Sequence, residues 1–364
     1  MITISLCMIV KNEEEVLEQC LSSVKEACDE IIIVDTGSED RTKEIAQSFT
    51  DKVFDFEWID DFSAARQYAF DQATSEYILW LDADDMLNDE DKVKLISLKQ
   101  SLSSEVDAVS MLYHIAYDAA GQPSFSYRRN RLVKRSKGFK WIGPVHEYLE
   151  VSGTIIASDI AVRHKKFMKK KRQVSGSRNL DIYEKRLAKG ESFSPRDLFY
   201  YANELKDNAK YHKAIMYYRE FLATKKGWVE DEIRACLNMY ECYRGLDNAE
   251  KSMEALVMSM NYDVPRPEVS CKIGDIYKNK GQHKKAALWY RLALEVEVND
   301  SQGFVQRQYS TWYPHLQLVV CCWELGEQEQ AMAHNQAAGE YLPESPQVKH
   351  NEAFFTEYFK SKAT

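Results

Sequence analysis

The hydrophobic period of the chain changes part of the way along, which predicts two kinds of architecture in one sequence. Up to about residue 117, short β-branched runs alternate with amphipathic helical patterns. Strands are expected over 2–10, 30–35, 53–57, 77–82 and 108–117, and helices over 13–27, 42–48 and 64–73. Such alternation is typical of an α/β fold with a mainly parallel sheet covered on both faces. Ligands bind beyond the carboxyl ends of parallel strands, so polar residues at those ends are the candidate site residues.

From about residue 194 the strand patterns end and a helical repeat begins. Gly274 and Ala286 occupy small positions of a tetratricopeptide (TPR) unit, and Tyr277 and Tyr290 occupy aromatic positions. Small residues let paired helices approach closely, while aromatic side chains fill the gaps between successive pairs. We therefore predict an α/β domain over 1–190, with a basic linking segment at 163–190. Three or four TPR-like repeats are expected over 191–364, with an insertion around 300–314.

Composition narrows the class of protein further. The 364 residues carry a formal charge of −9, which argues against nucleic acid as the main partner. No apolar run approaches the ~18 residues of a membrane helix, and the N-terminal residues lack the pattern of a secretory signal. None of the eight cysteines forms a CxxC pair, which favours a reduced, cytoplasmic protein without disulfides.

The sharpest motif is Asp82-Ala83-Asp84-Asp85, which follows an apolar strand. Carboxylates in this spacing suit Mg²⁺ or Mn²⁺, which take a few carboxylate oxygens and share phosphate oxygens with a ligand. The alternative is an Asp-rich turn in which Asp85 or Asn88 caps the next helix.

A second buried strand also ends in an aspartate. Asp35 is followed by a Gly37-Ser38 turn and a helix start at Asp40 and Thr42. The usual residue preferences of a strand-to-helix loop explain Gly37, Ser38 and Asp40 but do not require Asp35. We place the Asp35 carboxylate at the edge of the sheet where ligands bind.

Three motifs occur together in order: Lys11-Asn12-Glu13-Glu14 after the first strand, Val34-Asp35-Thr36-Gly37-Ser38, and Asp82-Ala83-Asp84. In combination they resemble the family 2 glycosyltransferases of the GT-A fold, which implies a Rossmann-like mixed sheet. Residues 58–66 and 143–147 are similar to a branch of that family often fused to TPR repeats. The branch includes enzymes that glycosylate glycocin bacteriocin peptides and sugar transferases of lipopolysaccharide cores.

The resemblance implies a role for particular residues. It assigns binding of a UDP-sugar donor to Val10, Asn12, Asp35, Arg66, Asp82 and Asp84. It implies a metal ion, Mn²⁺ or Mg²⁺, held by Asp84 and a histidine, for which His164 and His146 are the candidates.

Glu147 falls where related enzymes carry the catalytic base that accepts the acceptor's proton. They often have Glu-Asp there, so His146-Glu147 departs from the pattern, and a structural hydrogen-bonded pair is the alternative. His164, likewise, is either a ligand or a polar residue at a strand end.

Two basic clusters have more than one possible role. The run over 163–172 fits a diphosphate, an anionic membrane surface or a solvated charge run. The second cluster contains residues that could face the acceptor: Arg128, Arg129, Arg131, Lys134 and Arg135.

The sequence thus predicts a metal-dependent, inverting glycosyltransferase that moves a sugar, glucose in the first instance, from a UDP-sugar. The expected acceptor is a Cys, Ser or Thr of a peptide such as a glycocin precursor, bound through the helical repeats. The alternatives are a cell-envelope glycan or lipopolysaccharide-core transferase and an inactive TPR scaffold. Pairing of two copies through the helical half is also compatible with the repeats.

Overall fold

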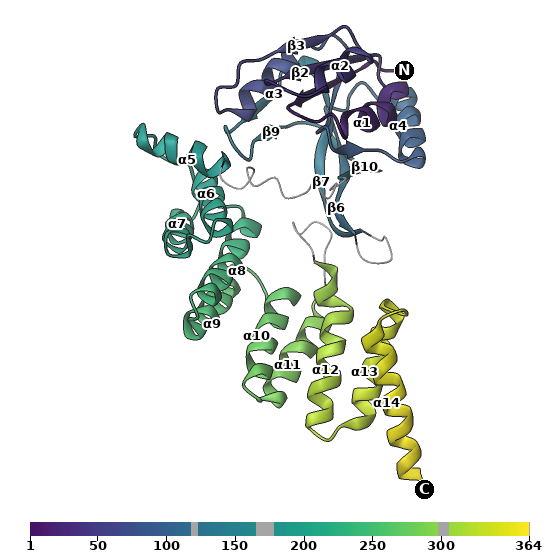
Figure 1. The fold of residues 1–364 in the computed structure, drawn as a ribbon, viewed down its shortest axis with the longest axis vertical. Helices are drawn as coiled ribbons and strands as arrows, with labels where there is room; N and C mark the ends of the chain where they lie inside the picture. The colour runs from purple at the N-terminus through teal and green to yellow at the C-terminus, as the bar shows by residue number, and fades with distance from the viewer. Residues whose placement is uncertain (118–122, 165–177, 298–305, 364) are drawn as a thin grey trace. The chain divides into compact units, whose positions relative to one another are not determined.

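The computed structural model describes residues 1–117, 123–164, 178–297 and 306–363. The chain divides into two compact units, Met1–Gly190 and Glu191–Thr364 (Figure 1). Each unit has its own hydrophobic core. Residues 165–172 of the expected basic run over 163–172 lie outside the described residues, as do residues 300–305 of the expected insertion over 300–314.

An eight-stranded mixed sheet forms the centre of the first unit. Its spatial order is β3 (Val53–Asp55), β2 (Glu30–Asp35), β1 (Ile4–Val10), β4 (Tyr77–Trp80), β7 (Pro123–Lys134), β6 (Ala108–Tyr117), β10 (Ile155–His164) and β5 (Asp85–Met86). The first four strands are parallel, as expected. The strand β7 was not predicted, and it runs antiparallel to both β4 and β6. The sheet is therefore mixed, as the family resemblance implies.

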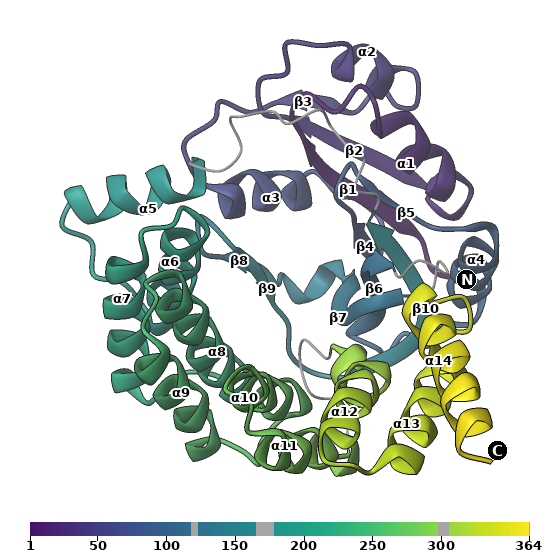
Figure 2. The ribbon, with the colours of Figure 1, turned by 60° about the horizontal axis from the view of Figure 1, so that its bottom comes forward.

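Helices cover both faces of this sheet (Figure 2). Ile4, Leu6 and Met8 of β1 point to the face covered by α1 (Leu17–Val24) and α4 (Asp89–Ser101). Cys7 points to the other face, where α3 (Phe62–Asp71) packs. This is the alternation that a strand buried on both sides requires.

The remaining elements of the first unit are short. Two strands, β8 (Lys140–Ile142) and β9 (Tyr148–Glu150), form a small antiparallel sheet. The helix α2 (Thr42–Gln47) follows β2, and α5 (Arg178–Ala188) ends the unit. The predicted helix over 13–27 is shorter than expected, because residues 14–16 form a turn before α1 and Lys25–Ala27 form a 3₁₀ helix after it.

Helices of the second unit pack in consecutive pairs, as the TPR-like pattern predicts. The helices are α6 (Pro195–Asp207), α7 (Tyr211–Thr224), α8 (Val229–Gly245), α9 (Ala249–Met258), α10 (Pro267–Asn279), α11 (His283–Glu295), α12 (Trp312–Glu324), α13 (Gln328–Tyr341) and α14 (Pro346–Ala363). A Cβ atom on Gly274 would lie 2.7 Å from the ring of Tyr290, so only glycine fits where α10 meets α11. Among the described residues, no helix combines the length and the apolar composition needed to cross a bilayer.

Candidate active site

Adjacent parallel strands bring several of the predicted residues to one edge of the sheet. Val10 ends β1 and is paired in register with Asp35 at the end of β2, while Asp82 follows β4 on the other side of β1. Asn12 lies just beyond β1 in a left-handed backbone conformation, with φ of 55°. Its side-chain oxygen accepts a hydrogen bond of 2.8 Å from Glu39 N, so Asn12 joins the loops that follow β1 and β2.

Asp35 forms hydrogen bonds to the described residues through one of its two carboxylate oxygens. Its Oδ1 accepts hydrogen bonds from the backbone N–H groups of Gly37 (2.9 Å) and Ser38 (2.8 Å). Its Oδ2 is buried and has no hydrogen-bond partner among the residues that the structure describes. A buried carboxylate oxygen without a partner is costly, and a ligand hydroxyl or N–H would satisfy it.

Arg66 of α3 contacts two carboxylates from distant parts of the chain. Its Nε donates to Glu147 Oε1 at 2.6 Å, and one terminal nitrogen donates to Asp82 Oδ1 at 2.6 Å. Burial opposes the charge of Arg66, but these carboxylates raise its pKa further above its usual value. Conversely, although burial raises the pKa of Asp82, the nearby arginines, Arg66 foremost, keep it well below its usual range. Asp82 therefore lies among several arginines, and Glu147 forms an ion pair with Arg66.

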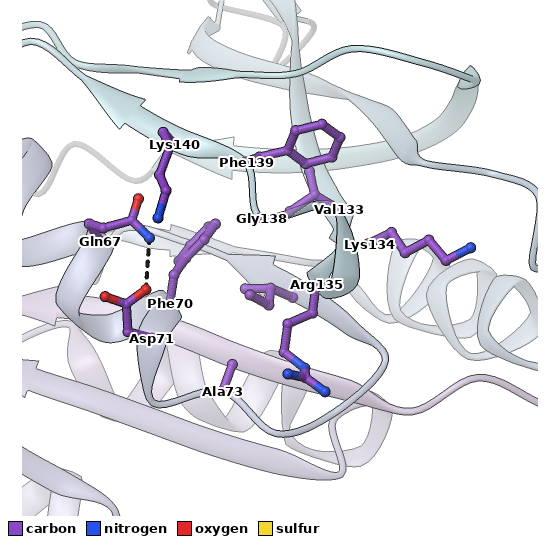
Figure 3. Close-up of a pocket in the computed structure, with 11 residues that line it drawn as sticks. Gln67, Phe70, Asp71, Ala73, Val133, Lys134, Arg135, Gly138, Phe139 and Lys140 are labelled. Atoms are coloured by element: carbon purple, nitrogen blue, oxygen red, sulfur yellow. Dashed lines mark hydrogen bonds between the residues drawn. The ribbon is translucent and has the colours of Figure 1, made fainter.

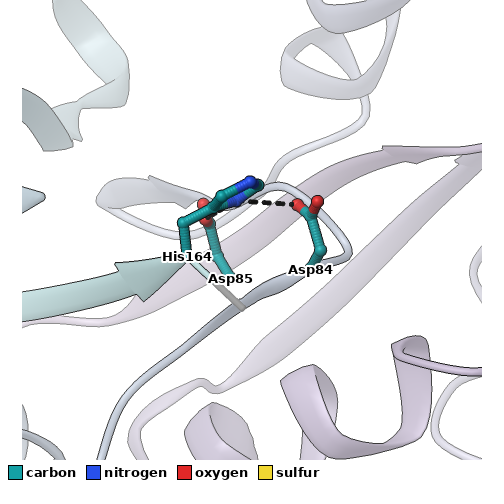
Figure 4. Close-up of side chains that lie close together, drawn as sticks. All are labelled: Asp84, Asp85 and His164. Atoms are coloured by element: carbon teal, nitrogen blue, oxygen red, sulfur yellow. Dashed lines mark ion pairs between the residues drawn. The ribbon is translucent and has the colours of Figure 1, made fainter. Parts of the chain in front are cut away.

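Asp84, Asp85 and His164 form the candidate metal centre (Figure 4). One ligand atom from each lies within 4.8 Å of the others, and His164 Nδ1 is 3.4 Å from Asp84 Oδ1 and 3.7 Å from Asp85 Oδ1. His164 Nδ1 and Asp85 Oδ1 are both buried and lack a hydrogen-bond partner within the described ranges. Asp84 and then Asp85 raise the pKa of His164 to about 10. Two carboxylates and one imidazole, with converging unsatisfied atoms, fit a divalent cation.

Asp85 was not predicted as a ligand, and its position depends on Arg131. Arg131 lies on β7 with no exposed side-chain surface, and it forms a 2.9 Å ion pair with Asp85 Oδ2. Its guanidinium carbon also lies 4.0 Å from the ring centroid of Trp80. Arg131 thus cannot face an acceptor, which was the role open to it in the sequence. Arg129 remains half-buried, with a terminal nitrogen 3.8 Å from Asp82 Oδ2.

His146 does not belong to the three-residue cluster found in the described part of the chain. Its backbone is left-handed, with φ of 52°, in the turn between β8 and β9. Neighbouring atoms of this turn are anchored by a 2.8 Å hydrogen bond from Phe62 N to Pro144 O. This hydrogen bond holds the turn that carries Glu147 against the start of α3.

A cavity of about 240 Å³ lies away from these residues (Figure 3). Its lining comes from α3, the segment after α3, β4 and the segment from β7 to β8. The residues are Gln67, Phe70, Asp71, Ala73, Ile78, Val133, Lys134, Arg135, Gly138, Phe139 and Lys140. Ile78 and Val133 are paired near the start of β4, the end opposite to the Asp82 loop. Its lining includes Lys134 and Arg135 of the second basic cluster, but none of the residues predicted to act as base, donor contact or metal ligand.

Comparison with known proteins defines the class of the first unit. The sequence model "Glycosyl transferase family 2" matches residues 5–148, and "Tetratricopeptide repeat" matches residues 267–298. The chain thus carries a family 2 glycosyl transferase domain followed by TPR repeats, which confirms the family expected from the motifs.

Curated relatives share parts of this arrangement. The chain is 30% identical over 234 residues to the SPbeta prophage-derived glycosyltransferase SunS of Bacillus subtilis, covering 62% of this chain and 54% of SunS. It is 40% identical over 155 residues to a TPR repeat-containing protein of Synechococcus elongatus, covering 42% of this chain and 36% of that protein. It is 29% identical over 162 residues to the lipopolysaccharide core biosynthesis glycosyltransferase LpsC of Rhizobium meliloti, covering 42% of this chain and 58% of LpsC. The chain therefore spans less than two thirds of the length of each of these relatives.

Proposed function

We propose that the protein is a divalent-metal-dependent, inverting glycosyltransferase that transfers a sugar from a UDP-sugar donor, with glucose as the first candidate sugar. The observation that carries this proposal is the convergence at one edge of the sheet of Asp35, the Asp82 loop and Glu147. The arrangement combines an unsatisfied buried carboxylate for a nucleoside, a cluster of metal-ligand type and a partly buried carboxylate of base type.

Each residue of the site would have a separate role in a single displacement reaction. Asp35 Oδ2 would accept a hydrogen bond from the uridine part of the donor, and Asp84 with His164 would hold the cation. When bound, Mn²⁺ or Mg²⁺ would neutralise charge that develops on the diphosphate. Glu147 would take the proton of the acceptor as the acceptor atom forms its bond to the anomeric carbon. The bond from that carbon to the diphosphate breaks, UDP leaves with the electron pair, and the configuration inverts.

For the acceptor we propose a Cys, Ser or Thr side chain of a peptide, such as a glycocin bacteriocin precursor. Support comes from the TPR repeats, because stacked helical repeats create extended surfaces suited to a peptide chain. It also comes from the similarity to SunS, which extends over 62% of the chain.

A second candidate acceptor is a cell-envelope glycan or a lipopolysaccharide core saccharide. The observation that favours it is the similarity to LpsC.

Mass spectrometry of acceptors decides between the two. The protein is incubated with UDP-glucose and MnCl₂, and with either Cys- and Ser-containing peptides or a lipopolysaccharide core oligosaccharide. Addition of one hexose to a peptide, absent when its Cys, Ser and Thr residues are replaced by Ala, supports the peptide acceptor. Addition to the oligosaccharide alone supports the envelope alternative.

A further inference from the structure

The family resemblance places Arg66 against the sugar donor, but its contacts suggest a different task. Both hydrogen bonds made by its Nε and by one terminal nitrogen are 2.6 Å long and end on carboxylates. Its side chain is only 10% exposed. Charge-assisted hydrogen bonds of this length are strong, so both carboxylates of the chain are firmly bound to this side chain.

Two tryptophans fix the guanidinium in place. Its central carbon lies 5.3 Å from the ring centroid of Trp80 and 5.0 Å from that of Trp141. The two indole rings contact each other edge to face at 4.8 Å, and Trp80 Nε1 donates to Asn130 O at 2.7 Å. Arg66 is therefore held by contacts with two aromatic rings as well as by its two carboxylates.

The two carboxylates that Arg66 joins have different roles in the proposed reaction, one near the metal cluster and one as the base. Asp82 lies in the loop that leads to the metal cluster, whereas Glu147 lies in the turn between β8 and β9. The Arg66 side chain thus links the loop that carries Asp82 with the turn that carries Glu147.

We propose that Arg66 is a positioning residue that orients Glu147 toward the acceptor and fixes it relative to the Asp82 loop, rather than a residue that binds the donor. This inference rests on the proposed function, in which Glu147 is the base. A guanidinium offers a planar fork to two acceptors, which the point charge of a lysine cannot reproduce. Misplacement of a reacting group by about 1 Å can cost about 100-fold in rate.

The test is a mutant cycle with Arg66→Met, which fills the space beside the indoles, Arg66→Lys, which keeps the charge, and Glu147→Gln. The rate of UDP release is measured with UDP-glucose, MnCl₂ and a Cys- and Ser-containing peptide pool, and UDP affinity is measured by calorimetry. We expect Arg66→Met to lower kcat about 100-fold while changing the KM for UDP-glucose less than about threefold. Arg66→Lys should restore less than about a tenth of the lost rate.

The double variant separates positioning from binding. If Arg66 acts through Glu147, Arg66→Met causes no further loss of kcat in the Glu147→Gln background. Multiplicative losses, or a higher KM with unchanged kcat, would overturn the proposal and return Arg66 to the donor site. UDP affinity close to that of the wild type shows that each variant is folded.

Arg41→Met and Arg41→Lys are the matched controls, because the Arg41 side chain is 73% exposed and its Nε lies 3.5 Å from Glu14 Oε2 in a surface ion pair. Both should retain the wild-type rate. A wild-type protein that releases no UDP with any acceptor would instead refute the proposed function, and with it this role of Arg66.

Discussion

Asp85 and Arg131 form an ion pair of 2.9 Å in which neither side chain has any exposed surface. The pair connects β7 with the loop that carries the candidate metal ligands. Arg131→Met should lower the free energy of unfolding by about 3–5 kcal/mol, because it removes the buried arginine that pairs with the buried Asp85 carboxylate. Urea unfolding measures this change. Arg128→Met, an exposed arginine on the same strand, should cost no more than about 1 kcal/mol. Equal effects of the two substitutions would contradict a special role for the buried pair.

Metal binding should depend on Asp84. Its carboxylate is part of the three-residue cluster, whereas the nearby Asp89 is exposed at the start of α4. Calorimetric titration of the protein with MnCl₂ in the presence of UDP should show affinity at least about tenfold weaker for Asp84→Asn. Asp89→Asn should bind the ion as the wild type does. Unchanged Mn²⁺ affinity in Asp84→Asn would remove the cluster from metal binding.

Substitution of Glu147 should affect transfer more than donor binding. Glu147→Gln keeps the size of the side chain and its ability to accept a hydrogen bond from Arg66, but it cannot take up a proton at neutral pH. We expect kcat to fall at least about 100-fold with UDP affinity nearly unchanged, since general base catalysis contributes about 10²–10⁴-fold. Glu150→Gln, on the exposed strand β9, is the control. A rate in Glu147→Gln equal to that of the wild type would exclude Glu147 as the base.

The helical unit should lose stability in acid because of a histidine pair. His315 Nδ1 and His334 Nδ1 lie 2.9 Å apart between α12 and α13. Burial, followed by the charge of His315 and of Arg291, lowers the pKa of His334 to about 4. The folded state then binds fewer protons than the unfolded state between about pH 6.5 and pH 4, so this contribution to stability is complete above about pH 6.5 and decreases as the pH falls.

Urea midpoints at pH 7.5 and pH 5 test this effect. The midpoint of the wild type should fall between these pH values more than that of His334→Gln. His212→Gln, which alters an exposed histidine of the same unit, should behave like the wild type. An equal decrease in all three proteins would show that the pair does not contribute.

Patterns of neighbouring residues in the sequence predicted an apolar strand and a helix cap. The strand over 30–35 was predicted with its observed bounds, because an uninterrupted apolar run of this length is typical of a strand buried on both faces. Asn88 was one of two predicted helix caps, and its side chain accepts a hydrogen bond from Asp91 N at 2.8 Å. Capping depends on residues three positions apart, which are visible in the sequence.

Features that depend on distant partners were not predictable in the same way. The strand β7 is rich in arginine and lacks the two-residue apolar alternation of a half-buried strand, so no strand was expected there. The burial of Arg131 is explained only by Asp85, and the environment of Arg66 depends on Trp141, which lies 75 positions further along the chain. The burial of these two arginines depends on tertiary contacts that local sequence patterns do not reveal.

The most direct test of the central claim is UDP release across a panel of UDP-sugars, measured with and without Mn²⁺, and with and without Cys- and Ser-containing peptides. The proposed function predicts release from one preferred donor that requires the metal and increases sharply when peptide is added. Binding of UDP without release from any donor, under all of these conditions, would contradict it and favour an inactive scaffold.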